Sequence, residues 1–189
     1  MSEHDLEAWE YTGQRSLATT RIFELRESRA RSPRTGEERD FTTLHTDDWV
    51  NVVPVTREGE LVLVRQWRHG NRRFTLEIPG GLVDPGEAPA AAGARETREE
   101  TGYAGDPIAL LGVVEPNPAI FDNRLHTFLI ENCVPVGAQE LDAGEDIAVE
   151  LVPLGDVPRL VREGVIAHSL VICGFWWLAL KRPDLLRLV

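Results

Sequence analysis

Short apolar runs separated by turn-forming residues dominate the hydrophobic pattern of this chain. Runs of this length, bounded by Gly, Pro, Asn or Asp, are typical of β-strands. They predict strands at residues 49–55, 61–67, 74–78, 108–114, 125–131 and 147–153. Residues 19–46 alternate only in part and contain a turn at 32–37, which indicates a hairpin or a small separate sheet.

Three segments have helical patterns instead. Residues 88–101 are rich in Ala, with Pro89 in the first turn and Gly102 as a C-terminal stop. Residues 156–163 predict a short helix. Residues 169–181 are apolar on most sides, which indicates a helix that is buried or lies at an interface.

The order of these elements predicts an α+β fold, in which a mixed sheet is interrupted by one helix and followed by two more. We expect an N-terminal β region at 1–46 and a main domain at 47–189. A chain of 189 residues with 42% hydrophobic residues is long enough for one such domain and its core. We expect the aromatic residues of the last helix to pack in the core or at a subunit interface; they are Phe175, Trp176 and Trp177.

Three carboxylates on the first predicted helix suggest its chemistry. Glu96, Glu99 and Glu100 are spaced at i, i+3 and i+4, which places them on one face. Like charges at this spacing repel, whereas a hard divalent cation such as Mg²⁺ prefers oxygen ligands. Arg95 lies one turn before Glu99 and can pair with it. A solvated charged face is the alternative interpretation.

The residues before this helix support a binding function. The segments 78–81 and 84–86 are rich in Gly and Pro, and we expect them to form an irregular loop. Glycines in such a loop let backbone carbonyls and amides approach an ion or a phosphate closely. Loop, glycines and acidic helix follow one another in a fixed order, which favours a site over a merely solvated face. We include the Gly80 carbonyl among the expected metal ligands.

The formal charge of −11 limits the partners. It disfavours duplex nucleic acid and anionic membranes, but a bound metal can still attract a nucleotide. The two cysteines, Cys133 and Cys173, have apolar neighbours and are expected to be reduced core residues. The first residues lack the pattern of a signal peptide, and residues 169–180 are too few to span a bilayer. We therefore expect a cytoplasmic protein.

One basic, aromatic segment stands out in this acidic chain, at residues 65–73. On a strand, Arg65 and Trp67 point to one side and Arg68 to the other. A guanidinium can hold a phosphate with paired hydrogen bonds, so Arg65 and Arg68 are candidates for substrate binding. The alternative is a solvated strand end. Glu77 can either line a metal site or cap the sheet edge.

Two loops add further candidates. The loop at 115–124 is stiffened by prolines and carries amide side chains that can recognise polar groups. The loop at 142–146 is acidic, and a Glu or Asp beside a metal can deprotonate or orient water. Glu145 and Asp146 are available there, and an ordinary exposed turn is the alternative.

The segment from Gly81 to Tyr103 resembles the signature of the Nudix hydrolases. That signature reads Gly, five residues, Glu, seven residues, then Arg-Glu-aliphatic-x-Glu-Glu-x-Gly-aliphatic. The matching residues are Gly81, Glu87, Arg95, Glu96, Glu99, Glu100 and Gly102. Thr97 and Tyr103 stand where the signature has aliphatic residues, at positions that we expect to pack against other elements rather than to take part in the chemistry. The resemblance implies an α/β/α sandwich and metal-dependent hydrolysis.

Other segments resemble the ADP-ribose pyrophosphatase branch of that family, at 49–52, 64–70 and 76–81. The resemblance implies that Arg68 faces the diphosphate and that the loop at 142–146 supplies the base and a further metal ligand. Ala143 replaces one acidic residue of that loop. Glu145 is therefore the leading base, or a ligand while Glu99 is the base. That branch has a proline-containing loop near residue 118, a role that Pro118 can take, whereas the Asn117–Pro118–Ala119 and Asn123 pattern is similar to a sister group that cleaves nucleoside diphosphate sugars more broadly. The resemblance thus makes Pro118 and Asn123 candidates for substrate binding.

The expected function is Mg²⁺-dependent hydrolysis, with Mn²⁺ as a possible substitute. The substrate class is ADP-ribose or a nucleotide sugar such as GDP-mannose, and the products are a nucleoside monophosphate and a sugar phosphate. A non-catalytic nucleotide sensor is the alternative. The resemblance also implies a homodimer in which residues 19–46 reach the partner, and Phe23 or Trp49 then stacks on the base. We expect neither nucleic acid nor membrane as a partner.

Overall fold

The structure is a computed structural model that describes residues 6–188 of the chain. It divides into two compact units. The first contains the residues up to Asp47 together with Glu115–Asn123, and the second contains Asp48–Val114 and the residues from Arg124 onward. The expected division between 46 and 47 lies one residue away from this. The sequence did not indicate that the loop at 115–123 belongs with the N-terminal residues.

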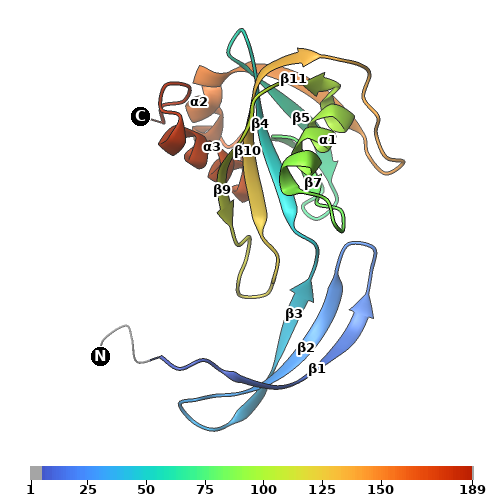
Figure 1. Ribbon diagram of the computed structural model, residues 1–189, viewed down its shortest axis with the longest axis vertical. Helices are drawn as coiled ribbons and strands as arrows, with labels where there is room; N and C mark the ends of the chain where they lie inside the picture. The colour runs from blue at the N-terminus through green and yellow to red at the C-terminus, as the bar shows by residue number, and fades with distance from the viewer. Residues whose placement is uncertain (1–5, 189) are drawn as a thin grey trace. The chain divides into compact units, whose positions relative to one another are not determined.

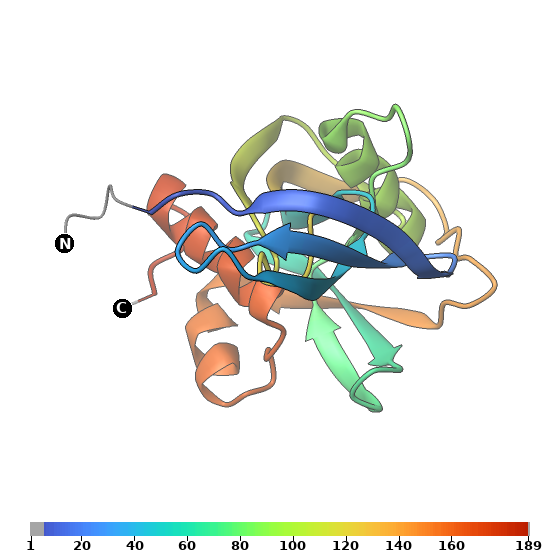
Figure 2. The same ribbon diagram turned by 90° about the horizontal axis from the view of Figure 1, so that it is seen from below.

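The first unit is a three-stranded antiparallel sheet in the order β1–β2–β3 (Figures 1 and 2). Its strands are β1 (Glu10–Thr19), β2 (Glu24–Arg31) and β3 (Glu38–His45). The sequence predicted β2 and β3, whereas β1 is an addition, because its residues are all exposed and lack an apolar alternation. The loop at 115–123 joins the unit through the Leu44 N–H, which donates to the Ile120 carbonyl at 2.7 Å.

The second unit is built on an eight-stranded mixed sheet in which only β4 and β10 run parallel. The order is β11–β5–β4–β10–β8, with β6 paired to β5, β7 to β4 and β9 to β10. The strands are β4 (Trp49–Thr56), β5 (Glu60–Arg68), β6 (Arg73–Glu77), β7 (Gly80–Leu82), β8 (Tyr103–Ala104), β9 (Ile108–Val114), β10 (Leu125–Pro135) and β11 (Ile147–Pro153).

Three α-helices cover the two faces of this sheet (Figure 1). Helix α1 (Pro89–Thr101) lies on one face, and α2 (Val157–Arg162) and α3 (Ser169–Lys181) lie on the other. A 3-10 turn at Leu154–Asp156 leads into α2. Alternate residues of β5 fill the two cores: Val62 packs on the α1 side, whereas Leu61 and Leu63 pack on the α3 side. This is the expected α+β, α/β/α arrangement.

Helix α1 ends as its sequence predicts. Gly102 adopts a left-handed conformation, with φ 72°, and its N–H donates to the Arg98 carbonyl at 2.8 Å. Thr97 is fully buried, and its hydroxyl donates a hydrogen bond to the Gly93 carbonyl at 2.7 Å. A threonine therefore serves at a position where the signature has an aliphatic residue. Tyr103 packs against the same core as α1.

One expectation about local structure needs correction. Gly80–Leu82 is not irregular: it forms strand β7, whose residues Gly80, Gly81 and Leu82 pair with Asn51, Val50 and Trp49. A glycine is required there, because a Cβ on Gly80 would lie 2.2 Å from the Val50 carbonyl oxygen. In α3, Phe175 is buried and Trp177 packs on the main core, as expected. Trp176 is 57% exposed, so its packing at a subunit interface stays a prediction.

Within the described residues, none of the helices combines the length and the apolar character needed to cross a membrane.

Candidate functional site

Glu100 is the most deeply buried carboxylate of α1, only 4% exposed. Its Oε2 accepts a hydrogen bond from the Gly80 N–H of β7 at 3.0 Å. Burial raises the pKa of Glu100 to about 8, against the effect of that hydrogen bond, and the charges of Glu96 and Glu145 raise it further. A buried carboxylate with like charges around it is poorly compensated by the protein alone.

Glu96 lies one turn earlier on the same face of α1 and is partly buried. Burial raises the pKa of its carboxyl, and Arg95 opposes this effect, while Glu99 and Glu145 add to it. Gly81 of β7 lies directly against this carboxylate, because a Cβ on Gly81 would be 2.4 Å from Glu96 Oε1. The signature glycine is therefore needed to leave room for a signature glutamate.

Arg95 connects the loop before α1 to the carboxylates on the helix. Its Nε and Nη2 donate to the two oxygens of Glu87 at 3.1 and 2.9 Å. Its Nη1 donates to Glu96 at 2.9 Å and to Glu99 at 3.1 Å, and Nη2 also reaches the Leu82 carbonyl at 3.1 Å. The expected pairing of Arg95 with Glu99 is present, together with further contacts that spacing did not reveal.

Glu145 is exposed and lies in the loop between β10 and β11. Its Oε2 accepts the Asp142 N–H at 3.0 Å, and its own N–H donates to the Asp142 carbonyl at 2.9 Å. The charge of Glu145 acts on Glu96, Glu100 and Arg68, so the loop lies beside the helix carboxylates.

Gln139 ties this loop to the end of α1, and sequence reasoning missed it. Its Nε2 donates to the Glu100 carbonyl at 2.6 Å and to the Ile147 carbonyl at 3.1 Å. The Glu140 N–H adds a bond to the Glu99 carbonyl at 2.9 Å. A single glutamine in a polar loop forms no sequence pattern that predicts its contact with the end of α1.

Arg68, at the end of β5, is paired with Glu77 on β6. Arg68 Nε donates to Glu77 Oε1 at 2.9 Å and Nη2 donates to Oε2 at 2.8 Å. Burial acts to raise the pKa of Glu77, but Arg68 and the Thr75 hydroxyl outweigh it and lower that pKa. Glu77 is therefore the buried partner of an arginine. Arg68 also interacts electrostatically with Glu100 and Glu145, which places it beside the carboxylates.

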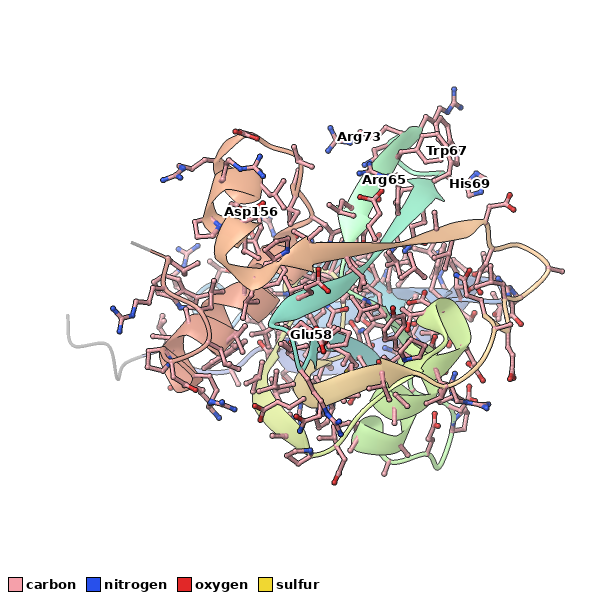
Figure 3. The ribbon with its side chains drawn as sticks, turned by 90° about the horizontal axis from the view of Figure 1, so that it is seen from above. Glu58, Arg65, Trp67, His69, Arg73 and Asp156 are labelled. Atoms are coloured by element: carbon pink, nitrogen blue, oxygen red, sulfur yellow. The ribbon has the colours of Figure 1, made fainter. Side chains whose placement is uncertain are left out.

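Arg65 lies on the opposite face of β5, as strand alternation predicts. It pairs with Glu150 of β11 through Nε and Nη2, the latter at 3.1 Å. Figure 3 shows Arg65 and Trp67 along the β5–β6 hairpin. The rings of Trp67 and Phe74 meet edge to face, with centroids 5.2 Å apart. The structure does not bring Arg65 to the group around Glu100.

Pro118 and Asn123 belong to the first unit, whereas the carboxylates belong to the second. Pro118 is exposed. Asn123 is 3% exposed, and its Nδ2 donates to the Asp47 carbonyl at 3.3 Å. Its Oδ1 is buried without a hydrogen-bond partner among residues 6–188. The roles of both residues in substrate binding stay predictions, as do the proposed contacts of Phe23 and Trp49.

The donors around Glu100 fit a hard divalent cation. The charge of Glu96 raises the pKa of Glu100, the charge of Glu99 raises the pKa of Glu96, and Glu145 acts on both, so positive charge placed among these carboxylates would relieve their repulsion. The Gly80 carbonyl stays a predicted ligand. In the part of the chain that the structure describes, no three His, Cys, Asp or Glu side chains already converge as a formed metal site. Arg95 engages Glu96 and Glu99 in this arrangement.

Comparison with known proteins identifies the family. The family model described as NUDIX domain matches residues 45–172, which is more than half of the chain. The chain belongs to the Nudix family. The Nudix chain is 33% identical to the ADP-ribose pyrophosphatase of Bacillus subtilis (strain 168) over 133 residues, 70% of this chain and 72% of that protein.

Two further similarities extend over almost the whole Nudix chain. It is 31% identical to the ADP-ribose pyrophosphatase of Mycobacterium tuberculosis (strain ATCC 25618 / H37Rv) over 176 residues, 92% of this chain and 83% of that protein. A crystal structure of an ADP compounds hydrolase superposes with a TM-score of 0.85 at 20% identity, covering 95% and 96% of the two chains. The expected Nudix fold is confirmed, and the Nudix chain is a pyrophosphohydrolase resembling ADP-ribose pyrophosphatases.

Proposed function

We propose that this enzyme hydrolyses the diphosphate bond of ADP-ribose or of a nucleoside diphosphate sugar such as GDP-mannose, and that it depends on Mg²⁺. The products are a nucleoside monophosphate and a sugar phosphate. The observation that carries the proposal is the group of mutually repelling carboxylates around Glu100, next to an arginine that can bind phosphate. The names of two relatives, both ADP-ribose pyrophosphatases, support the substrate class.

In this proposal Glu96, Glu99, Glu100 and the Gly80 carbonyl hold Mg²⁺, with Mn²⁺ as a substitute and Glu145 as a further ligand or the base. When bound, such a cation neutralises diphosphate charge and lowers the pKa of a bound water. The residues of the chain do the remainder: they orient the substrate and accept the proton. Geometry and charge together supply most of the catalysis in phosphoryl chemistry.

Glu145 is the first candidate for the general base. It is exposed, and its Oε2 accepts the Asp142 N–H, so the other oxygen can accept a proton from water. Glu99 is the second candidate, but its Oε2 already accepts a hydrogen bond from Arg95 at 3.1 Å. Arg68 binds the diphosphate with the N–H groups that do not face Glu77. Arg65 has no part in the proposal, since it lies on the other face of β5.

We also propose that the active form is a homodimer in which the first unit contacts the partner. Small isolated sheets are rarely stable without a covering element. All ten residues of β1 are exposed, and Trp9, Tyr11 and Phe41 present large apolar side chains to solvent. A second copy of the chain is an occupant that would cover such a surface.

Turnover of a compound panel tests the proposed function. ADP-ribose, several nucleotide sugars and nucleoside triphosphates are incubated with Mg²⁺, with Mn²⁺ and with EDTA, and the products are identified by chromatography. We expect Mg²⁺-dependent formation of a nucleoside monophosphate and a sugar phosphate. Binding of ADP-ribose without turnover of any compound would instead support the nucleotide sensor that the sequence left open.

Glu100→Gln should abolish this turnover while the protein stays folded. The substitution keeps the shape of the side chain but removes one charge from the proposed metal site, and leaves the Gly80 N–H with an oxygen acceptor. The check is the rate of hydrolysis across a Mg²⁺ titration, with circular dichroism to confirm the fold. Wild-type rates at saturating Mg²⁺ would contradict the metal assignment.

A further inference from the structure

The pair of Arg68 and Glu77 has an asymmetric geometry. Glu77 occupies one edge of the guanidinium, formed by Nε at 2.9 Å and Nη2 at 2.8 Å. A guanidinium has five N–H donors in a fixed plane. Both N–H groups of Nη1 and the second N–H of Nη2 therefore do not face Glu77, and one N–H of each Nη forms the end edge of the guanidinium. Two parallel donors on one edge match two oxygens of a phosphate.

Glu77 is itself held in place. It is only 2% exposed, and the Thr75 hydroxyl donates to its Oε1 at 2.6 Å. Thr75 and Glu77 are two residues apart on β6 and so face the same side of the sheet, the side of Arg68. The orientation of the guanidinium is thus fixed through a chain that runs from Thr75 to Glu77 to Arg68.

A buried ion pair is a poor device for stability, because removing two charges from water costs about as much as their attraction returns. The side chain of Arg68 is 44% exposed, so its charge could remain in water without Glu77. The burial of a carboxylate behind it therefore indicates a role other than stabilising the fold. The charges of Glu100 and Glu145 act on the guanidinium of Arg68, and we expect the diphosphate to bind beside these carboxylates.

We propose that Glu77 is a positioning residue for substrate binding: held by Thr75, it fixes the guanidinium of Arg68 so that the Nη1 edge faces the diphosphate. This inference rests on the proposed function, because it assumes that a diphosphate binds beside Glu100. Glu77 does not touch the substrate and holds no metal. A free arginine side chain would lose conformational entropy when it binds the substrate. Because Glu77 already fixes Arg68 in the unbound enzyme, binding does not have that cost.

The chain offers a matched control on the same strand. Arg65 is paired with Glu150 by the same two atoms, Nε and Nη2, but on the opposite face of β5. Glu77→Gln and Glu150→Gln therefore make the same chemical change to two pairs with the same bonding pattern, although the side chain of Glu77 is 2% exposed and that of Glu150 is 36% exposed. Only the first pair lies beside the carboxylates of α1.

The experiment compares steady-state kinetics of ADP-ribose hydrolysis in saturating Mg²⁺. We expect Glu77→Gln to raise KM about tenfold and to change kcat less than about threefold, since part of one charge-assisted contact is lost. Glu150→Gln should leave both constants within about twofold of wild type. An equal effect of the two substitutions on KM would overturn the inference, because it would show a general loss of sheet stability.

Thr75 gives a second test that leaves both charges in place. Thr75→Val removes the hydroxyl that holds Glu77 and should raise KM by a smaller factor, about threefold. Thr75→Ser retains a hydroxyl and should restore the wild-type KM. If Thr75→Val and Thr75→Ser have the same KM, the hydroxyl does not act through Glu77 and the chain of positioning is wrong.

A double variant separates this inference from the proposed function. In an Arg68→Gln background, Glu77→Gln should change KM by less than about twofold, because Glu77 has no guanidinium left to orient. An undiminished effect of Glu77→Gln in that background would overturn the inference. If wild-type enzyme cleaves none of the compounds, the proposed function fails; if it cleaves them and Glu77→Gln leaves KM unchanged, only the positioning role fails. Should Arg68→Gln not fold, the Thr75 pair decides the question.

Discussion

At the scale of residues, the properties of the candidate metal site depend on several carboxylates that lie close together and are partly buried. Glu100 is almost fully buried and forms no ion pair within residues 6–188, whereas Glu96 and Glu99 share Arg95. The first contribution to the raised pKa of Glu100 is burial, and the neighbouring carboxylates add to it. The site is therefore strained without a cation, and this strain has measurable consequences.

The stability of the metal-free protein should fall as pH rises, owing to Glu100. The pKa of Glu100 rises from its ordinary value of 4.5 to about 8 in the folded state. Between these values the folded protein retains a proton that the unfolded chain has lost, so folding is favoured at the acidic end and this contribution disappears as pH rises through about 8. Glu100→Gln removes this dependence.

The measurement is urea denaturation in EDTA at pH 5.5 and at pH 8. We expect Glu100→Gln to gain stability over wild type, and the gain to be larger at pH 8. Glu163→Gln, at an exposed position after α2, serves as the control and should show no such trend. A gain that is the same at both pH values would show that the charge of Glu100 is not the cause.

Gly81→Ala should weaken metal binding while the fold remains intact. A Cβ at this position would lie 2.4 Å from Oε1 of Glu96, the end of a side chain that can move. We therefore expect the Glu96 carboxylate, and not the backbone, to move, which displaces it from its place beside Glu100. Mn²⁺ affinity, measured by calorimetry, should decrease about tenfold, as expected for a disturbed ligand or its support.

Gly155→Ala is the matched control for that substitution, since a Cβ at Gly155 meets nothing within 4 Å. Its Mn²⁺ affinity should equal that of wild type. Equal affinities for Gly81→Ala and wild type would show that Glu96 is not a ligand, or that it binds from another position.

At the scale of elements, local patterns predicted what depends on neighbours in sequence. The limits of α1 follow from Pro89 and Gly102, and the buried strands follow from their apolar runs. Strand β1 was missed because none of its residues is buried, and β7 because its pairing with β4 depends on residues thirty positions away. The spacing of Glu77 revealed no arginine partner, since that contact depends on the register of β5 and β6.

The loop between β10 and β11 is the element on which the base is proposed to lie. Glu145→Gln should lower kcat about 10²–10⁴-fold, the usual contribution of a general base, with little change in substrate affinity. The check is single-turnover kinetics together with calorimetric binding of ADP-ribose. Asp146→Asn, on the neighbouring exposed residue, is compared with it and should retain most of the activity if Glu145 rather than Asp146 is the base.

Two outcomes would assign the loop differently. A loss of less than about tenfold in Glu145→Gln would transfer the role of base to Glu99 or Asp146. A loss that high Mg²⁺ restores would mark Glu145 as a ligand, because added metal compensates for weakened binding but not for a missing base.

At the scale of the whole molecule, the first unit raises the question of what covers it. Its three strands bury few side chains: β1 is exposed throughout, and β3 is exposed over its first five residues. Trp9 and Phe41 pack edge to face, with centroids 5.2 Å apart, yet each remains 40% exposed. A sheet with so little core gains little stability from its own burial.

The enzyme should therefore be a homodimer whose association depends on residues 1–46, of which 1–5 lie outside the described residues. An obligate interface commonly buries more than about 2,000 Å² and is apolar, which the exposed aromatic residues of the first unit could supply. Light scattering at micromolar concentration should give twice the mass of the 21.1 kDa chain. A chain that begins at residue 47 should be monomeric or aggregated, with little activity.

Phe41→Lys in the full chain is the milder variant. It keeps the N-terminal segment but places a charge on the proposed interface, and it should shift the measured mass toward that of the monomer. A fully active monomer, in either the wild type or the shortened chain, would show that the first unit serves neither association nor catalysis.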